Sequence, residues 1–124
     1  NFGHTFAHSL EEVAADEKNK FNLNHGEAVG IGILCEMHYA ETNYQYIKRI
    51  SRLLNVFSLP EKLNLPANIN KINFQKRVFN HLFLDKKKVS NFPRYIHIKE
   101  NSEPSIKELK DFQLIDEIMF NFIT

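Results

Sequence analysis

The chain has 124 residues and a formal net charge of +1, and charged side chains make up 25% of it. A balance this near to neutral gives no electrostatic preference for nucleic acid or an anionic membrane, and no apolar run reaches the roughly 18 residues that a membrane span needs. Cys35 is the single cysteine, which excludes a disulfide within the chain and is compatible with a reducing, cytoplasmic location. The length and composition predict one globular domain, residues 1–124.

Helical periodicity dominates the first half of the chain. Apolar residues recur at helical spacing over 2–15, and the polar stretch 16–24, rich in Asn and Lys, predicts a loop. Residues 26–46 are apolar on most sides, which predicts a long helix at the centre of the core. A third helix is expected at 46–56, with the stripe Ile47, Ile50, Leu53 and Leu54.

Gly30 and Gly32 lie inside the predicted central helix. Each costs a helix about 1 kcal/mol relative to alanine. We therefore expect another backbone or a ligand to approach the helix closely at these positions.

The second half of the chain alternates helix, connector and strand. Two Leu-Pro pairs, at 59–60 and 65–66, predict a connector, because the residue before a proline is disfavoured in a helix. The elements expected after it are a helix at 72–85, a strand at 94–98, a turn at 101–104 and a partner strand at 105–109. Asp111 is expected to cap a last helix that runs through Ile123. The residues of this helix expected to face inward are Phe112, Ile115, Ile118, Met119 and Phe122. The predicted fold class is mainly α, a helical bundle with one small β-hairpin.

Three histidines are the first candidates for chemistry. His4 and His8 stand four residues apart, so a helix places both rings on one face, and His25 opens the next predicted helix. Two imidazoles from neighbouring helices can hold one divalent metal, and a third can serve beside it as an acid or base. The alternative is that all three are ordinary polar residues that bind nothing.

A zinc site with two histidines requires a further protein ligand. Glu11 and Glu12 lie a turn beyond His8 and are poorly placed to join His4, and Glu27 is better suited to orient an imidazole from outside the metal shell. A carboxylate from sequence upstream of this chain is the preferred third ligand. The motif begins at residue 1 without an initiator Met, so the chain is expected to be part of a longer protein.

Two polar features admit both a functional and a structural interpretation. Asn1 shares the face of His4 and His8 and could donate to a substrate oxygen or cap the helix. Lys86 to Lys88 could bind a phosphate or simply form a solvated helix end. The remaining histidines and the cysteine receive no site role: His38, His81, His97 and Cys35.

Three sequence blocks, in this order, carry a family resemblance. They are Asn-Phe-Gly-His-Thr-Phe-Ala-His at 1–8, His-Gly-Glu-Ala-Val-Gly-Ile-Gly at 25–32 and Asp-Lys-Lys at 85–87 before a strand. Together they closely resemble the C-terminal domain of the 3-dehydroquinate synthases, a sugar-phosphate cyclase family, over essentially the whole chain. The resemblance implies a helical metal- and substrate-binding domain that works beside an N-terminal NAD-binding domain, absent from this sequence.

The resemblance also implies roles for individual residues. His4 and His25 would bind zinc or cobalt, with an upstream glutamate as the third ligand. His8 would be catalytic, Asn1 would bind substrate, and Lys86 or Lys87 would bind its phosphate. The reaction would convert the seven-carbon sugar acid phosphate DAHP to 3-dehydroquinate with loss of phosphate, in the shikimate pathway and in the cytoplasm.

The resemblance further implies a homodimer at full length, with NAD bound mainly by the other domain. These 124 residues alone are expected to be inactive, since they contain no dinucleotide-binding fingerprint. Three alternatives stay open at this point. They are a related sugar-phosphate cyclase, a metal-dependent polyol or alcohol dehydrogenase that needs no phosphate-binding lysine, and a non-catalytic helical interaction module.

Overall fold

The computed structural model describes residues 2–17, 21–84, 92–99 and 103–124. The elements are α1 (His4–Ala15), α2 (His25–Tyr39), α3 (Tyr44–Val56), α4 (Lys71–Phe83), β1 (Arg94–His97), β2 (Ser105–Glu108) and α5 (Phe112–Phe122). The described part of the chain is therefore mainly helical with one antiparallel hairpin, which confirms the predicted fold class. No helix in these ranges combines the length and apolar character that crossing a lipid bilayer requires.

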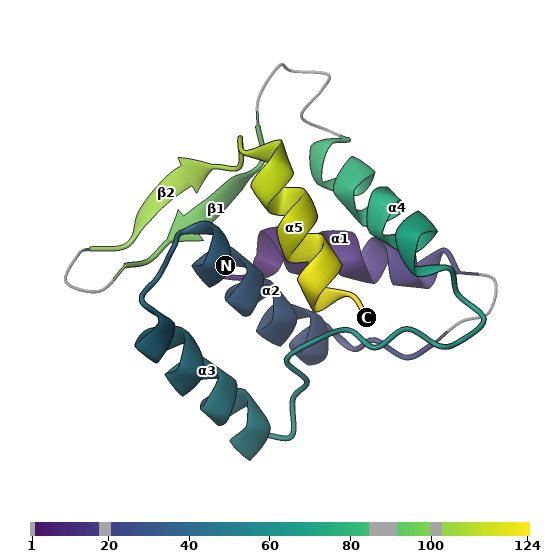
Figure 1. Ribbon diagram of the computed structural model, residues 1–124, viewed down its shortest axis with the longest axis horizontal. Helices are drawn as coiled ribbons and strands as arrows, with labels where there is room; N and C mark the ends of the chain where they lie inside the picture. Colours follow the sequence, from purple (N-terminus) through teal and green to yellow (C-terminus); the bar gives the residue numbers. More distant parts are fainter. Residues whose placement is uncertain (1, 18–20, 85–91, 100–102) are drawn as a thin grey trace.

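Helix α2 lies at the centre of the fold. It packs against α1, α3, α5 and β1, and Figure 1 shows these elements arranged around it. Buried residues occur on most of its sides, because neighbouring elements cover most of its surface. They include Ala28, Ile31, Leu34, Cys35 and Met37. The prediction of a buried central helix is confirmed.

The predicted length of that central helix is wrong. The sequence pattern predicted one helix to residue 46, but α2 ends at Tyr39 and α3 begins at Tyr44. Glu41 adopts a left-handed backbone with φ of 56°, which a continuing helix cannot contain. The Asn43 side chain then accepts a hydrogen bond from the Gln45 amide and starts α3.

Polar loop residues determine where most of the helices begin. Asn70 and Asp111 each accept a hydrogen bond from the backbone amide three residues further on, so the predicted cap at Asp111 is confirmed. Asn24 does the same with the Glu27 amide, and the Glu27 carboxylate accepts a hydrogen bond from the Asn24 amide in return. This reciprocal box fixes the start of α2, the helix that His25 opens.

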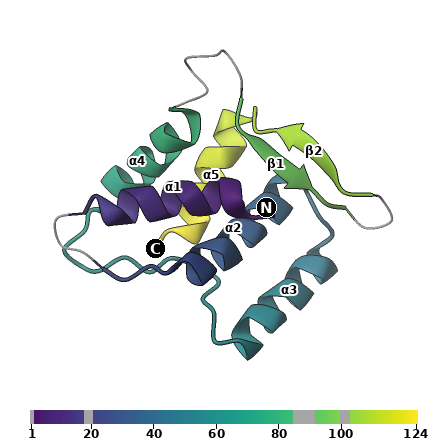
Figure 2. The ribbon, with the colours of Figure 1, turned by 180° about the vertical axis from the view of Figure 1, so that it is seen from behind.

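Helix α1 begins differently, because it follows a glycine that packs against α2. Gly3 precedes α1 with φ of 81°, and a Cβ on it would lie 2.8 Å from the Val29 carbonyl oxygen. A Cβ on Gly32 would overlap the carbonyl oxygen of Gly3. Figure 2 shows α1 crossing α2 with its first turn against that helix. The expected close backbone approach is thus confirmed at Gly32, whereas Gly30 faces the Leu54 side chain.

The chain's last residues tie the connector to the core. Leu63 pairs with Ile123 in an isolated bridge, and the Leu65 amide donates to the Thr124 carbonyl. The predicted connector between α3 and α4 is therefore an ordered strap across the end of α5. Two residues predicted to face inward, Leu53 and Phe112, are instead about half exposed. Leu54, next to Leu53, is the residue that faces α2. Phe112 lies at the edge of the core, where its ring packs against that of Phe83.

Candidate metal and substrate site

The crossing of α1 over α2 brings three histidine rings together. The centroid of the His4 ring lies 5.2 Å from that of His25 and 5.6 Å from that of His8. His4 and His8 come from consecutive turns of α1, and His25 is the first residue of α2. The rings lie at the surface, where His25 and His8 are exposed and His4 is half-buried. Residues separated by a loop in sequence thus form one cluster, referred to below as the histidine cluster.

The hydrogen bonds of two rings leave the same nitrogen free on each. The Nδ1 atom of His4 lies 3.2 Å from the Phe2 carbonyl oxygen, so it donates there and carries the ring proton. The Nδ1 atom of His25 lies 2.9 Å from Oε1 of Glu11. In the neutral form of both rings, Nε2 is then the nitrogen with a free lone pair. Metal-binding histidines characteristically have this arrangement, with one nitrogen held by a carbonyl or carboxylate and the other directed to the ion.

His8 is arranged differently from the other two. Its ring lies nearly parallel to that of His25, with 29° between the planes and 6.5 Å between the centroids. Its centroid is thus further from that of His25 than the His4 centroid is. Within the described ranges, no set of three or more His, Cys, Asp or Glu side chains is arranged to hold a metal. His4 and His25 therefore form a pair of candidate ligands with His8 beside them.

The carboxylate that orients His25 is Glu11, so the expectation that Glu27 would orient an imidazole is wrong. Glu27 is used in the capping box of α2, whereas Glu11, one turn beyond His8 on α1, forms an ion pair with His25. The sequence offered no direct signal for this pair, because the two residues are 14 positions apart across a loop. Glu11 is held by His25 rather than placed beside His4.

Removing the Glu11 carboxylate is expected to weaken metal binding at His25 without displacing either helix. Glu11→Gln should lower the affinity for Zn²⁺ or Co²⁺ about tenfold, since partners that orient a ligating histidine typically contribute 10- to 100-fold. Competition with a chromogenic chelator measures this loss. Glu12→Gln is the matched control, because Glu12 is exposed on the next position of α1. Equal affinities for the two variants would contradict the assigned role of Glu11.

A buried carboxylate lies beneath the first turn of α1. Glu36 of α2 is 0% exposed, and its Oε1 accepts a hydrogen bond of 3.4 Å from the Ile96 amide. Burial raises the pKa of this carboxyl to about 7, and hydrogen bonding by the amides of Gly3 and Ile96 lowers it in part. Oε2 has no hydrogen-bond partner among the described residues.

The free energy of unfolding is expected to fall as pH rises through the titration of Glu36. The folded pKa of about 7 lies above the ordinary value of 4.5, so between these values the folded state holds a proton that the unfolded state releases. Protonated Glu36 contributes about 3 kcal/mol to the free energy of unfolding relative to ionised Glu36. This contribution is present below about pH 4.5 and is lost above about pH 7.

Glu36→Gln lacks this titration. In urea unfolding at about pH 4 and pH 8, the stability of Glu36→Gln relative to the unsubstituted chain should rise by about 3 kcal/mol toward the higher pH. Comparing the two proteins at each pH cancels the titration of other groups. Glu12→Gln again serves as the exposed control. A difference that stays constant with pH would show that Glu36 is not the titrating group.

Several sequence-predicted residues take no part in the histidine cluster or lie outside the described part of the chain. Asn1, Lys86 and Lys87 lie outside the described residues, so their predicted contacts with substrate stay predictions. Cys35 is 0% exposed, and burial raises the pKa of its thiol well above the ordinary value, as expected of an inert core cysteine. His38 packs its ring 5.1 Å from that of Phe122.

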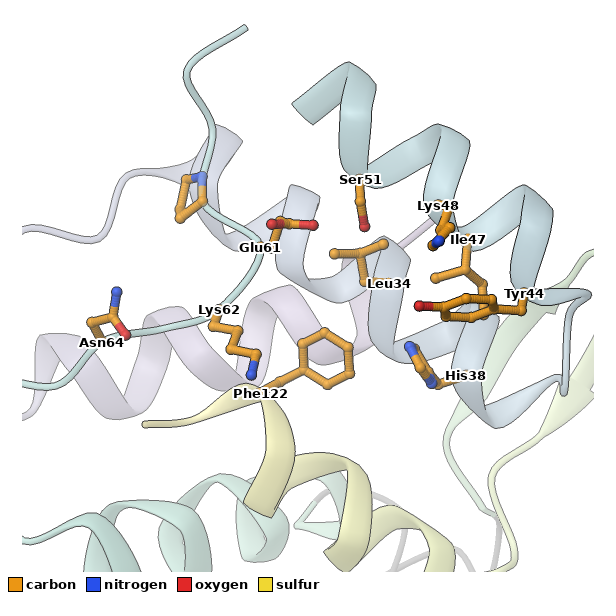
Figure 3. Close-up of a pocket in the computed structure, with 11 residues that line it drawn as sticks. Leu34, His38, Tyr44, Ile47, Lys48, Ser51, Glu61, Lys62, Asn64 and Phe122 are labelled. Atoms are coloured by element: carbon orange, nitrogen blue, oxygen red, sulfur yellow. The ribbon is translucent and has the colours of Figure 1, made fainter. Parts of the chain in front are cut away.

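Two larger cavities lie away from the histidine cluster. One, of about 550 Å³, lies between α2, α3 and the connector. Figure 3 shows His38, Tyr44 and Phe122 in its wall. Another of the same volume lies between α4 and α5. None of the three clustered histidines lines either cavity. The candidate site is therefore identified by its ligand chemistry and not by its size.

Comparisons with known proteins agree with the resemblance. The family model for the 3-dehydroquinate synthase C-terminal region matches residues 1–88. The 3-dehydroquinate synthase of Ruminiclostridium cellulolyticum is 32% identical over 123 residues, covering 98% of this chain and 32% of that protein. That of Chlorobium chlorochromatii is 33% identical over 104 residues, covering 81% of this chain and 27% of that protein. That of Clostridium tetani is 33% identical over 109 residues, covering 86% of this chain and 26% of that protein.

The fold and the site together define a helical domain that carries a pair of histidines where two helices cross. The chain belongs to the 3-dehydroquinate synthase family and corresponds to its C-terminal region. The predicted family is thus confirmed. The chain spans about a third or less of the length of these relatives.

Proposed function

We propose that this chain supplies the metal- and substrate-binding part of a 3-dehydroquinate synthase, a lyase that forms 3-dehydroquinate from DAHP with loss of phosphate. The single observation that carries the proposal is the pairing of His4 with His25. Their rings meet across two helices, and each Nδ1 is held by the protein so that Nε2 is free for a metal. The reaction is inferred from family membership. The histidine pair is the reason to infer that this domain takes part in the reaction.

The donor set fits zinc or cobalt. Neutral imidazole nitrogens are favoured ligands of both ions, and a carboxylate holds one of the two rings in place. The third ligand would be an upstream glutamate, so zinc binding by these 124 residues alone should be weak. When bound, the metal would stabilise negative charge on a substrate oxygen. Apart from orienting His25, Glu11 has no further role in this proposal.

The chain's own residues would bind the substrate and move its protons. His8 is exposed beside the ligand pair, so its imidazole can accept or donate a proton at a substrate that occupies the cluster. Asn1 would donate to a substrate oxygen, and Lys86 or Lys87 would bind the phosphate that leaves. NAD would be bound mainly by the N-terminal domain. We further propose a cytoplasmic homodimer at full length, with no nucleic-acid or membrane partner.

A chimera tests this function. The 124 residues replace the matching C-terminal segment of the R. cellulolyticum enzyme, over which the alignment covers 98% of this chain. Turnover of DAHP to 3-dehydroquinate, with release of phosphate and no net change in NAD, is the expected result. His4→Ala and His25→Ala should abolish it, and His38→Ala is the control, since His38 lies outside the cluster.

Folding of the chimera is measured separately by thermal unfolding and NAD binding. A folded chimera that binds NAD and zinc but does not release phosphate would overturn the proposed reaction. The isolated chain is expected to show no turnover. Turnover by these 124 residues without any added polypeptide would contradict the proposed division of the site between two parts of the enzyme.

A further inference from the structure

The cavity between α2, α3 and the connector has a buried apolar floor. Its volume of about 550 Å³ lies within the roughly 300–1,000 Å³ that is usual for small-molecule sites. Leu34 of α2, Ile47 of α3 and Phe122 of α5 form this floor, and each of these residues is at most 8% exposed. An apolar group placed in the cavity would therefore leave water for a surface that belongs to the core of the fold.

The cavity between α4 and α5 has the same volume but no such floor. Its two large apolar residues, Ile72 and Phe120, are 61% and 58% exposed, and the other described residues of its wall are polar or charged. This second cavity is an open groove on the surface, and it provides a comparison site within the same molecule.

Charged side chains lie on opposite sides of the apolar floor. Figure 3 shows Glu61 and Lys62 of the connector on one side, and Tyr44 and Lys48 of α3 on the other. The Nζ atom of Lys48 lies 5.0 Å from the centroid of the Tyr44 ring, and this cation–π contact stabilises the ring at its side of the cavity. Desolvation lowers the pKa of His38, so its imidazole is neutral at pH 7 and adds no charge to the wall.

Glu61 and Lys62 are consecutive residues of opposite charge, and neither side chain has a partner among the described residues. Neither forms an ion pair or a side-chain hydrogen bond there. Figure 3 shows the Lys62 ammonium directed toward the Phe122 ring of the floor. A carboxylate and an ammonium side by side at the edge of an apolar floor complement a ligand with both charges on neighbouring groups and an apolar body. An α-amino acid has this arrangement of charges.

We propose that this cavity binds an amino acid with an apolar side chain. The ammonium of the ligand donates to Glu61, and its carboxylate accepts from Lys62. Its side chain lies on Leu34 and Phe122, against the Tyr44 ring. None of the three clustered histidines lines the cavity, and the ligand is a zwitterion and not a sugar acid phosphate. The amino-acid site is therefore separate from the proposed reaction.

Titration with L-leucine, followed by NMR of this chain, tests the site without metal, NAD or turnover. Leucine should shift the amide resonances of Ile47, Glu61 and Lys62 in a saturable way. The amide resonance of Phe120, in the comparison cavity between α4 and α5, should not move. Shifts of equal size in both cavities would show non-specific association and would contradict the proposal.

Two leucine analogues assign each charged residue to one group of the ligand. Glu61→Gln should weaken leucine binding about fivefold, as expected when an exposed ion pair is lost, and leave isocaproate, which has no ammonium, unaffected. Lys62→Gln should weaken leucine and isocaproate and leave isoamylamine, which has no carboxylate, unaffected. Glu117→Gln is the matched control, because Glu117 is exposed and lines only the comparison cavity. A purely structural effect of either variant would weaken all three ligands alike.

The proposal is overturned if leucine causes no saturable shift at the cavity, or if each variant weakens the three ligands equally. Ligand-detected NMR of the chimera extends the test to a complete enzyme, where leucine binding should persist. Loss of leucine binding in a folded chimera would also contradict the proposal. None of these results affects the metal pair or the turnover of the chimera, so this site and the proposed function fail separately.

Discussion

Gly32→Ala is expected to destabilise the fold by about 3 kcal/mol and to disrupt the histidine cluster with it. The new Cβ would overlap the Gly3 carbonyl oxygen, which is backbone and cannot rotate away. Either α1 must move off α2 or its first turn must unravel, and both changes separate His4 from His25. Urea unfolding measures the stability, and the chelator competition described above measures the metal affinity.

Gly26→Ala and Gly30→Ala are the matched controls for this prediction. A Cβ on Gly26 would lie 3.5 Å from Oδ1 of Asn24, an ordinary contact, and one on Gly30 would meet a movable Leu54 side chain at 3.1 Å. Alanine also favours a helix over glycine by about 1 kcal/mol. Gly26→Ala should therefore be neutral or stabilising. If Gly32→Ala were as stable as Gly26→Ala, the close crossing of α1 and α2 would be wrong.

The second large effect is expected at the histidines themselves. His4→Ala or His25→Ala, each in the chimeric enzyme, should lower metal affinity by more than about 100-fold, because a ligand contributes more than the partner that orients it. His8→Ala should leave metal affinity within about threefold while it reduces turnover by about 100-fold or more, as expected for loss of an acid or base. Metal analysis of the purified variants and a phosphate-release assay separate the two effects. Loss of metal in His8→Ala would contradict the division of roles.

The sequence predicted those parts of the fold that depend on local pattern. The periodicity of Phe6, Leu10 and Val13 located α1, and all three residues are buried. The cost of glycine in a helix signalled the close approach at Gly32. The break between α2 and α3 was missed, because it contains no glycine or proline. It depends on the left-handed Glu41 and on the buried Thr42, whose hydroxyl donates to the Ile98 carbonyl at 2.8 Å.

The candidate site was predicted in its histidines but not in their partners. Spacing put His4 and His8 on one face, and the start of a helix drew attention to His25. Nothing local indicated that Glu11 would meet His25 or that Ser9 would meet His81, since these pairs form only when separate helices pack.

The claim at the centre of this account is that His4 and His25 share one metal ion through Nε2. Paramagnetic NMR of this chain with Co²⁺, at concentrations high enough for weak binding, tests it most directly. The account predicts contact-shifted ring protons from both His4 and His25, with Nδ1–H signals retained, and loss of both sets in either His4→Ala or His25→Ala. Shifts confined to one of these rings, or centred on His8, would contradict it.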